Sequence, residues 1–136
     1  MGRVGEPFVG LFRDNVEVTL LASAVRSATT PSGDQINYNA RGVLVVFDVT
    51  AVPTVNTVNC QIQAKDPVSG KYVTLADSGA QATAGTYTIL VYPGATDTDT
   101  KLTAKNDIPL PRTWRVNVVH SAATNFTYSV GGSYIL

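Results

Sequence analysis

The chain of 136 residues contains one cysteine, one histidine, one tryptophan and one methionine. Because Cys60 stands alone, the chain cannot form an internal disulfide, and it lacks the four ligands that a structural zinc site needs. A single domain of this length buries roughly two-thirds of the surface that its unfolded chain exposes. The sequence therefore predicts one domain that folds without a disulfide or a metal.

Net charge is missing too, because ten basic and ten acidic residues give a formal charge of zero. The basic residues are spread along the chain, whereas nucleic-acid-binding proteins usually show a basic excess or cluster. No apolar run approaches the roughly 18 residues of a membrane span. Glu6, Pro7 and Arg13 interrupt the start, which leaves no apolar core for a secretory signal. We expect a protein made in a cytoplasm and not processed, with neither nucleic acid nor membrane as a partner.

Residue combinations that carry catalysis are also scarce. His120 would need a nearby nucleophile and an orienting acid. The neighbouring Ser121 points to the opposite side of a strand, however, and the sequence has no GxSxG. Asp97 and Asp99 have the spacing that opens a calcium loop, but the glycine and the closing glutamate of that motif are absent. The sequence therefore predicts no catalytic, cofactor-binding or metal-binding residue.

What the sequence does contain is alternation of apolar and polar residues, rich in Val and Thr, with turn residues between the segments. This period of two predicts strands over 16–24, 57–65, 71–76 and 86–92. Residues 43–49 are apolar on both faces up to Asp48, which indicates a central strand. The DPVSG sequence at 66–70 predicts a hairpin that joins 57–65 to 71–76. The inner faces of the first two strands should be formed by Val16, Val18, Leu20, Ala22 and Ala24, and by Val58, Cys60, Ile62 and Ala64.

The same parity places the lone tryptophan and histidine. In 113–120 the even positions are Trp114, Val116, Val118 and His120, and in 126–130 they are Phe126, Tyr128 and Val130. If the two strands pair as a hairpin, register requires Val118 opposite Tyr128 and Val116 opposite Val130. The loop is then roughly three or five residues long, and Asn125, which tolerates a left-handed backbone, suits the end of the five-residue version. We interpret Trp114 as a core residue and His120 as a strand-end residue.

These patterns predict an all-β fold: a single antiparallel β-sandwich, jelly-roll-like, of roughly seven or eight strands. We divide the chain into an extended N-terminal arm at 1–15 and a sandwich domain at 16–136. The segment 95–111 has no sustained period and is predicted to be a long loop. The arm and this loop are the segments that we expect to contact a partner, through Phe8, Leu11, Phe12, Arg13, Thr98, Lys101, Leu102 and Ile108.

Aromatic residues offer a competing function, because an exposed aromatic platform on a β-sandwich can bind a sugar ring. Parity commits Trp114, Phe126, Tyr128 and Tyr87 to the apolar face. The tyrosines left for such a platform are Tyr38, Tyr72, Tyr92 and Tyr134. A carbohydrate- or receptor-binding module is therefore the second hypothesis, and an unrecognised hydrolase is the third.

Four stretches carry a resemblance to a known family: YNARGVLVVFDVTAVP at 38–53, VNCQIQAKDPVSGKYVTL at 58–75, LVYPG at 90–94 and LPRTWRVNVVHS at 110–121. Together they resemble a small all-β structural protein of tailed bacteriophages, of the head decoration (capsid cement) type. The resemblance covers residues 38–136. It implies a non-enzymatic virion protein, made in the host cytoplasm, that stabilises the capsid by binding the major capsid protein lattice.

The resemblance transfers no catalytic or ligand residue, and a tail or neck component of the particle would show similar patterns. A flat Val/Thr strand edge favours self-association unless something covers it, so we expect a homo-oligomer, with a trimer as the working guess.

Overall fold

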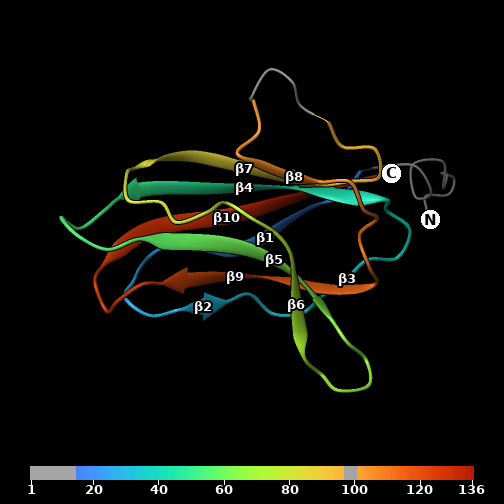
Figure 1. Ribbon diagram of the computed structural model, residues 1–136, viewed down its shortest axis with the longest axis horizontal. Coiled ribbons are helices and arrows are strands. Elements are labelled where there is room, and N and C mark those ends of the chain that lie inside the picture. Colours follow the sequence, from blue (N-terminus) through green and yellow to red (C-terminus); the bar gives the residue numbers. More distant parts are fainter. Residues whose placement is uncertain (1–14, 97–100) are drawn as a thin grey trace, which may run out of the picture.

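The computed structural model describes residues 15–96 and 101–136, and all the regular structure in these ranges is β-strand (Figure 1). Seven strands have six residues or more, and three are shorter. The strands are β1 (Glu17–Arg26), β2 (Thr30–Pro31), β3 (Gln35–Ile36), β4 (Gly42–Ala51), β5 (Val58–Lys65), β6 (Tyr72–Asp77), β7 (Gly85–Val91), β8 (Ala104–Asn106), β9 (Thr113–His120) and β10 (Phe126–Ile135).

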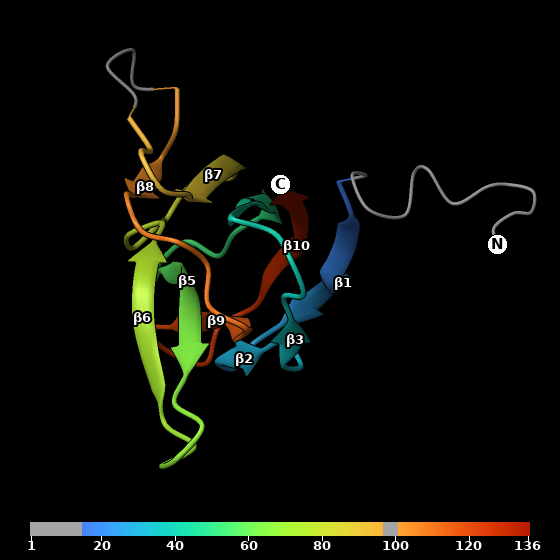
Figure 2. The same cartoon turned by 90° about the vertical axis from the view of Figure 1, so that its right-hand side faces the viewer.

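The strands form two sheets that face each other (Figure 2). The first sheet has the order β1-β10-β4-β7-β8, and the second has the order β2-β9-β5-β6, with β3 also paired to β9. One core cluster draws side chains from both sheets. The all-β prediction is confirmed, and the arrangement is consistent with a β-sandwich. The expected central strand at 43–49 is also confirmed, because β4 lies between β10 and β7.

Alternation explains which side chains reach the core. Every second residue is buried from Val58 to Ile62 in β5 and from Trp114 to Val118 in β9, but at the end of β5 Gln63 is buried and Ala64 is only half-buried. The predicted inward set of Val58, Cys60, Ile62, Trp114, Val116, Val118, Phe126 and Tyr128 is buried completely. Pairs such as Cys60 opposite Val118 and Ile62 opposite Val116 lie on the same inner face. Period-two parity therefore predicts the core of these strands correctly.

The predicted hairpin at 66–70 is confirmed as the connection from β5 to β6. Gly70 has a φ of 74°, a conformation that glycine adopts without steric cost, and its N–H donates to the Asp66 carbonyl at 2.9 Å. The Asp66 carboxylate accepts from the Ser69 hydroxyl and from the N–H groups of Val68 and Ser69. These bonds lower the pKa of Asp66, the Ser69 hydroxyl making the largest contribution.

The predicted hairpin between 113–120 and 126–130 is wrong. β9 pairs with β2, β3 and β5, whereas β10 pairs with β1 and β4, so the two strands belong to opposite sheets. Residues 121–125 cross from one sheet to the other, and Val118 and Tyr128 are not ladder partners. Asn125 is not in the left-handed region either; among the described residues, Asn56 is the only non-glycine residue with a positive φ, at 79°.

The first strand keeps only part of its predicted face. Of its predicted inward residues, Leu20 is buried, but Val16, Ala22 and Ala24 are exposed. The register shifts between Thr19 and Leu21 and again between Leu21 and Ala24, where two residues of β1 oppose one residue of β10. The first bulge moves the inward position from Ala22 to Leu21, which packs against the core, and a strict alternation cannot anticipate this change. Val16 precedes β1, and Ala24 follows the second bulge on a strand at the edge of the sheet.

The predicted long loop at 95–111 contains a strand. β8 pairs in parallel with β7, with Ala104 opposite Ile89, so the first sheet is not purely antiparallel. Leu110 is buried, and Ala104 and Ile108 pack against the core. A strand of three residues is too short to show a period, which is why the sequence predicts a loop there.

Residues 1–14 of the predicted arm lie outside the described residues. Asn15, the last residue of the predicted arm, accepts a hydrogen bond from the Leu136 N–H at 3.2 Å.

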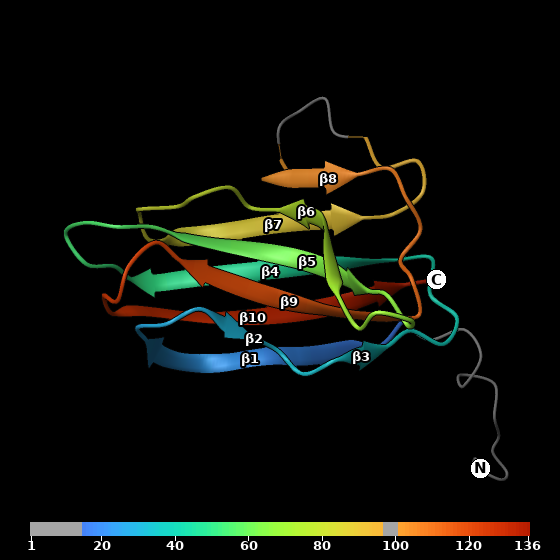
Figure 3. The same cartoon turned by 60° about the horizontal axis from the view of Figure 1, so that its bottom comes forward.

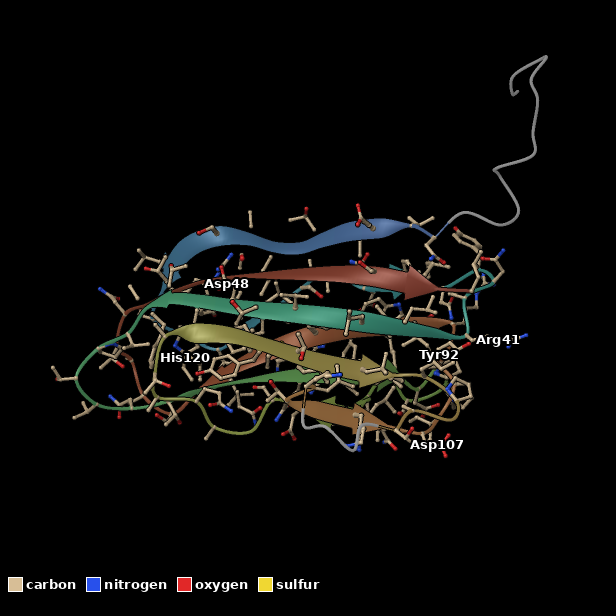
Figure 4. All side chains as sticks on the ribbon, turned by 90° about the horizontal axis from the view of Figure 1, so that it is seen from above. Arg41, Asp48, Tyr92, Asp107 and His120 are labelled. Carbon is tan, nitrogen blue, oxygen red and sulfur yellow. The ribbon has the colours of Figure 1, made fainter. Side chains whose placement is uncertain are left out.

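The strands run along the long axis of the molecule, and a different set of loops lies at each end of that axis (Figures 3 and 4). Arg41, Tyr92 and Asp107 lie at the end that also carries the C-terminus, and His120 lies towards the other end. At that other end the loop after β4 meets the crossing segment, where the Thr57 N–H donates to the Ser121 hydroxyl oxygen at 2.8 Å. Both ends are therefore built by side-by-side loops from distant parts of the sequence.

Candidate interaction surfaces

The eight predicted contact residues do not form one described surface. Phe8, Leu11, Phe12, Arg13 and Thr98 lie outside the described residues. The other three belong to the segment around β8. The Lys101 carbonyl accepts a hydrogen bond from the Thr88 hydroxyl at 3.5 Å, and Lys101 and Leu102 directly precede β8. Ile108 is half-buried and packs against the core, so its side chain is committed in part to the fold.

A cleft of about 290 Å³ opens at the end that carries the C-terminus. It is formed by the start of β1, by β3 and the segment after it, and by the end of β10. Its lining residues are Val16, Glu17, Val18, Gln35, Ile36, Asn37, Tyr38, Asn39, Ala40, Tyr134 and Leu136. We call this part of the molecule the cleft end.

Exposed apolar side chains gather at the cleft end. Tyr38 is 82% exposed, Val16 is 56% exposed, and Ile36 is also among the exposed large hydrophobic residues. All three line the cleft. A single exposed apolar residue is ordinary, but a group that borders a concave surface indicates an interaction site.

Several polar groups of the cleft are already used by the fold. The Asn37 side-chain amide donates to the Ala40 carbonyl at 2.8 Å and to the Leu110 carbonyl at 3.1 Å, and its oxygen accepts from the Ala40 N–H. The Gln35 amide donates to the Gly33 carbonyl. The side chains of Asn37 and Gln35 therefore have fewer free hydrogen-bonding groups to offer a ligand, which makes the cleft wall more apolar than its composition indicates.

Tyr134 connects the cleft to the core. Its hydroxyl accepts from the Trp114 indole N–H at 3.2 Å and donates to the Ile36 carbonyl at 3.4 Å. The two rings meet edge to face, with centroids 5.8 Å apart. Burial raises the pKa of Tyr134 above its usual value, and the Trp114 hydrogen bond acts in the opposite direction. Trp114 therefore contacts a residue of the cleft wall, Tyr134, without lining the cleft itself.

The four tyrosines considered for a sugar platform are not equivalent. Tyr38 and Tyr134 share the cleft, but Tyr92 lies beside Gly42 and is half-buried. Tyr72 is on the second sheet, where the Arg115 guanidinium carbon lies only 3.5 Å from its ring centroid. One face of the Tyr72 ring is therefore covered by an arginine and cannot stack on a sugar.

Tyr72 also takes part in a polar cluster on the second sheet. Its hydroxyl donates to Asp34 at 2.6 Å, and the Lys65 ammonium contacts the same carboxylate at 2.9 Å. These two contacts lower the pKa of Asp34, and the Tyr72 hydrogen bond has the larger effect. Arg115 donates to the Gln63 side chain at 2.9 Å. The cluster satisfies its own donors and acceptors, as a solvated outer sheet face does.

His120 and Cys60, the only histidine and the only cysteine of the sequence, are both packed within the fold. His120 ends β9, as predicted, and its Nε2 lies 2.9 Å from the Tyr128 hydroxyl. The hydroxyl oxygen of Ser121 accepts a hydrogen bond from the Thr57 N–H. Cys60 is completely buried, and burial raises the pKa of its thiol, which suppresses the reactive thiolate. Within residues 15–96 and 101–136, no three His, Cys, Asp or Glu side chains gather into a metal-binding group.

The sequence pattern placed Val16 on the inner face of the first strand and gave no role to Ile36 and Asn37, although all three line the cleft. Their signal was present in QINYNA at 35–40, where Ile36 and Tyr38 stand two apart and lead into the central strand. Two-residue strands such as β3 show no period, so the sequence alone does not assign a secondary structure to this segment.

Over the described part of the chain, no helix is long and apolar enough to cross a membrane.

A scan against protein-family models finds no match to this chain, and a search of the curated proteins finds no significant relative.

Proposed function

We propose that the chain is a non-enzymatic virion structural protein that decorates a phage capsid and stabilises it by binding the major capsid protein lattice. The observation that carries the proposal is the cleft end, where Val16, Ile36 and Tyr38 expose apolar surface around a concave wall. A protein that docks on a particle needs such a surface on a rigid body. We place the capsid contact there.

The resemblance to decoration proteins supports this role through the framework. Its four stretches correspond to β4, to the hairpin of β5 and β6, to the end of β7, and to β9. The finer architecture that we propose is a jelly-roll-like sandwich in which roughly seven or eight strands carry the core. These strands position the cleft end, whose contact residues lie mostly outside the shared stretches.

Lack of net charge fits docking by shape. Ten basic and ten acidic residues cancel, so the chain has little long-range field to steer it towards an anionic surface. Binding then depends on apolar contact and on multivalency around a symmetry axis, which raises avidity well above the affinity of one protomer. A homo-oligomer, for which we keep the trimer as the working expectation, would supply that multivalency at the capsid surface.

A carbohydrate- or receptor-binding module is the second candidate. The observation in its favour is that Tyr38 and Tyr134 line the same cleft. Against it stand the committed polar groups of Asn37 and Tyr134, which would otherwise have bonded sugar hydroxyls. We therefore rank this function below capsid decoration.

Co-sedimentation with expanded capsids that lack the protein tests the proposal. The wild-type chain should sediment with capsids, and Tyr38→Asp should lose most of its occupancy, because it places a charge in the apolar contact. Val68→Asp is the matched control, since Val68 is 93% exposed but lies at the tip of the hairpin of β5 and β6. It should bind as the wild type does.

Three other results would redirect the assignment. Equal occupancy of Tyr38→Asp and the wild type would move the contact away from the cleft end. Binding to tails or necks, seen by electron microscopy, would make the chain a tail or neck component. Tyr38-dependent binding to a glycan array without capsid binding would favour the second candidate.

A further inference from the structure

The outer face of the first sheet is more apolar than a solvated sheet face usually is. β4 is apolar on both faces from Val43 to Phe47, and its outward residues Leu44 and Val46 are half-buried. Leu90 of β7 lies beside Leu44 on the same face. These three outward residues neither belong to the core cluster nor pack against it. A strand with one solvated face normally alternates apolar and polar residues, so this apolar surface has no cover within the described part of the chain.

One row of five residues crosses the whole sheet on this face (Figure 4). Each residue is the ladder partner of the next: Glu17 of β1, Ser133 of β10, Leu44 of β4, Leu90 of β7 and Lys105 of β8. Residues directly opposite each other in a ladder point to the same face of a sheet. The row therefore has a carboxylate at one margin of the face, an ammonium at the other, and two leucines between them.

The two charges of this row cannot pair with each other within one chain. Glu17 and Lys105 stand on the two edge strands of the sheet, four strand spacings or about 19 Å apart. Both residues are exposed, and neither makes an ion pair within residues 15–96 and 101–136. A row that ends in two unpaired charges of opposite sign is complementary to the same row in reverse order.

We propose that this face binds a second copy of the chain about a twofold axis that runs parallel to β4 and passes over Leu44. Such an axis reverses the row, so Glu17 of each copy meets Lys105 of the other, and Leu44 meets its own counterpart. Ser133 meets Leu90 of the second copy, which places a small side chain against a large one. Sheets that stack face to face lie about 10 Å apart with nearly aligned strands, which suits these contacts.

The neighbouring rows decide where the contact is closest. In the next row Val46 lies between Gly131 and Thr88, so a glycine again faces a larger residue of the second copy. One row further, Asp48 faces Asp48 of the second copy. The Thr86 hydroxyl donates to this carboxylate at 3.0 Å but does not cancel its charge. The contact is therefore closest in the half of the face that lies towards the cleft end, and Asp48 limits its affinity.

The dimer leaves the proposed capsid contact accessible. Ile36 and Tyr38 do not belong to the first sheet, and of the row only Glu17 also lines the cleft. The order of charges favours a second copy over a capsid protein, because only a second copy carries the reversed row without further assumption. The inference does not depend on capsid binding. It refines the expected homo-oligomer from a working trimer to a twofold dimer.

Sedimentation of the full chain over a concentration series tests the dimer. The wild type should be dimeric. Lys105→Glu and Glu17→Lys should each raise the dissociation constant of the dimer roughly ten-fold or more, because each sets like charges against each other at both margins. Lys71→Glu is the matched control, since Lys71 is exposed on the hairpin of β5 and β6, and it should leave the dissociation constant unchanged.

Mixing the two single variants gives the sharper test. Glu17→Lys and Lys105→Glu, combined in equal amounts, should form a heterodimer in native mass spectrometry, because every pair across the axis is again of opposite sign. The double variant with both changes in one chain should regain the wild-type dissociation constant. Asp48→Asn should lower the dissociation constant, because it removes the like charges near the axis. An effect within one chain explains none of these three results.

Several outcomes would overturn the proposal. They are a monomeric or trimeric wild type, and two single variants that fail to form a heterodimer. A monomeric wild type whose capsid co-sedimentation is lost in Lys105→Glu would assign the face to the capsid protein instead of a second copy. Tyr38→Asp should remain a dimer, so that failure of the dimer and failure of the capsid contact are separate results.

Discussion

The Nε2 atom of His120 lies 2.9 Å from the Tyr128 hydroxyl, and this contact joins the two sheets. His120 ends β9 in the second sheet, and Tyr128 belongs to β10 in the first. The imidazole also meets the Phe126 ring edge to face, with centroids 5.6 Å apart. The lone histidine is therefore part of the packing between the layers at the end opposite the cleft.

This position makes stability depend on pH. Burial lowers the pKa of His120 below its usual value, and the Arg26 charge acts in the same direction, while the Thr124 backbone opposes them. The unfolded histidine, with a pKa near 6.5, therefore binds a proton more readily than the folded one. The contribution of His120 should be complete above about pH 6.5 and decrease as the pH falls below that value. Urea unfolding between about pH 5 and 7.5 measures it.

His120→Gln should remove this slope and cost about 1 kcal/mol at the upper pH, the usual worth of one hydrogen bond. Tyr128→Phe is the companion variant, because it removes the hydroxyl and keeps the histidine. Asp34 and Asp66, whose pKa values are lowered, titrate below this range and do not contribute to it. A slope that persists in His120→Gln would assign the pH dependence to another group.

Arg26 should stabilise the bulged edge of β1. Its guanidinium donates to the carbonyls of Ala22 at 2.5 Å, Ala24 at 3.4 Å and Tyr128 at 2.8 Å, and lies over the Tyr128 ring at 4.8 Å. Arg26→Met leaves these acceptors without their donor, which should cost roughly 1–3 kcal/mol in urea unfolding. Arg41→Met, at an exposed arginine, is the control and should stay within about 0.5 kcal/mol of the wild type. Equal losses in the two variants would contradict this role.

Gly42 should be irreplaceable for steric reasons. A β-carbon at this position would collide with the Val91 carbonyl oxygen and with the Tyr92 backbone, neither of which can move as a flexible side chain can. Gly42→Ala should therefore destabilise the fold by roughly 1–3 kcal/mol or more. Gly33→Ala is the matched control, because a β-carbon there meets nothing within 4 Å. Thermal unfolding that ranks the two variants equally would show that β4 and β7 can separate at this point.

Sequence parity identified the core but not the sheet to which each strand belongs. Trp114, Val116, Phe126 and Tyr128 are buried as predicted, but β9 and β10 are not neighbours in a ladder. Two strands that face each other across a core turn alternate residues inwards, as hairpin partners on one sheet do. Parity alone cannot separate these cases, and the five-residue connection at 121–125 is compatible with both.

The cleft could not be predicted from the sequence for a related reason. It is built by the first residues of β1, by β3 and by the chain end, which share no local pattern. The sequence marked Tyr38 and Tyr134 as candidate ligands through parity, but only the fold brings them to one wall. The arm at 1–15 was predicted to make contacts because it shows no internal period, and of its residues the structure describes Asn15, which bonds Leu136 beside the cleft.

Capsid binding should be insensitive to salt, because a neutral chain has little long-range field to be screened. Between about 50 and about 200 mM salt, binding driven by phosphate contacts loses roughly three to five orders of magnitude, whereas we expect the affinity of this chain to change less than about ten-fold. Deleting residues 1–14 should weaken binding and leave the body folded, since the described strands begin at Glu17 and build a core cluster between themselves. Replacing all of 95–111 would remove β8 and the buried Leu110, so a Gly/Ser replacement of 97–100 alone is the better second variant. Quantitative co-sedimentation over the salt series checks both expectations. A steep salt dependence, or wild-type occupancy in both variants, would place the contact on charged or sheet-face residues instead of the cleft end.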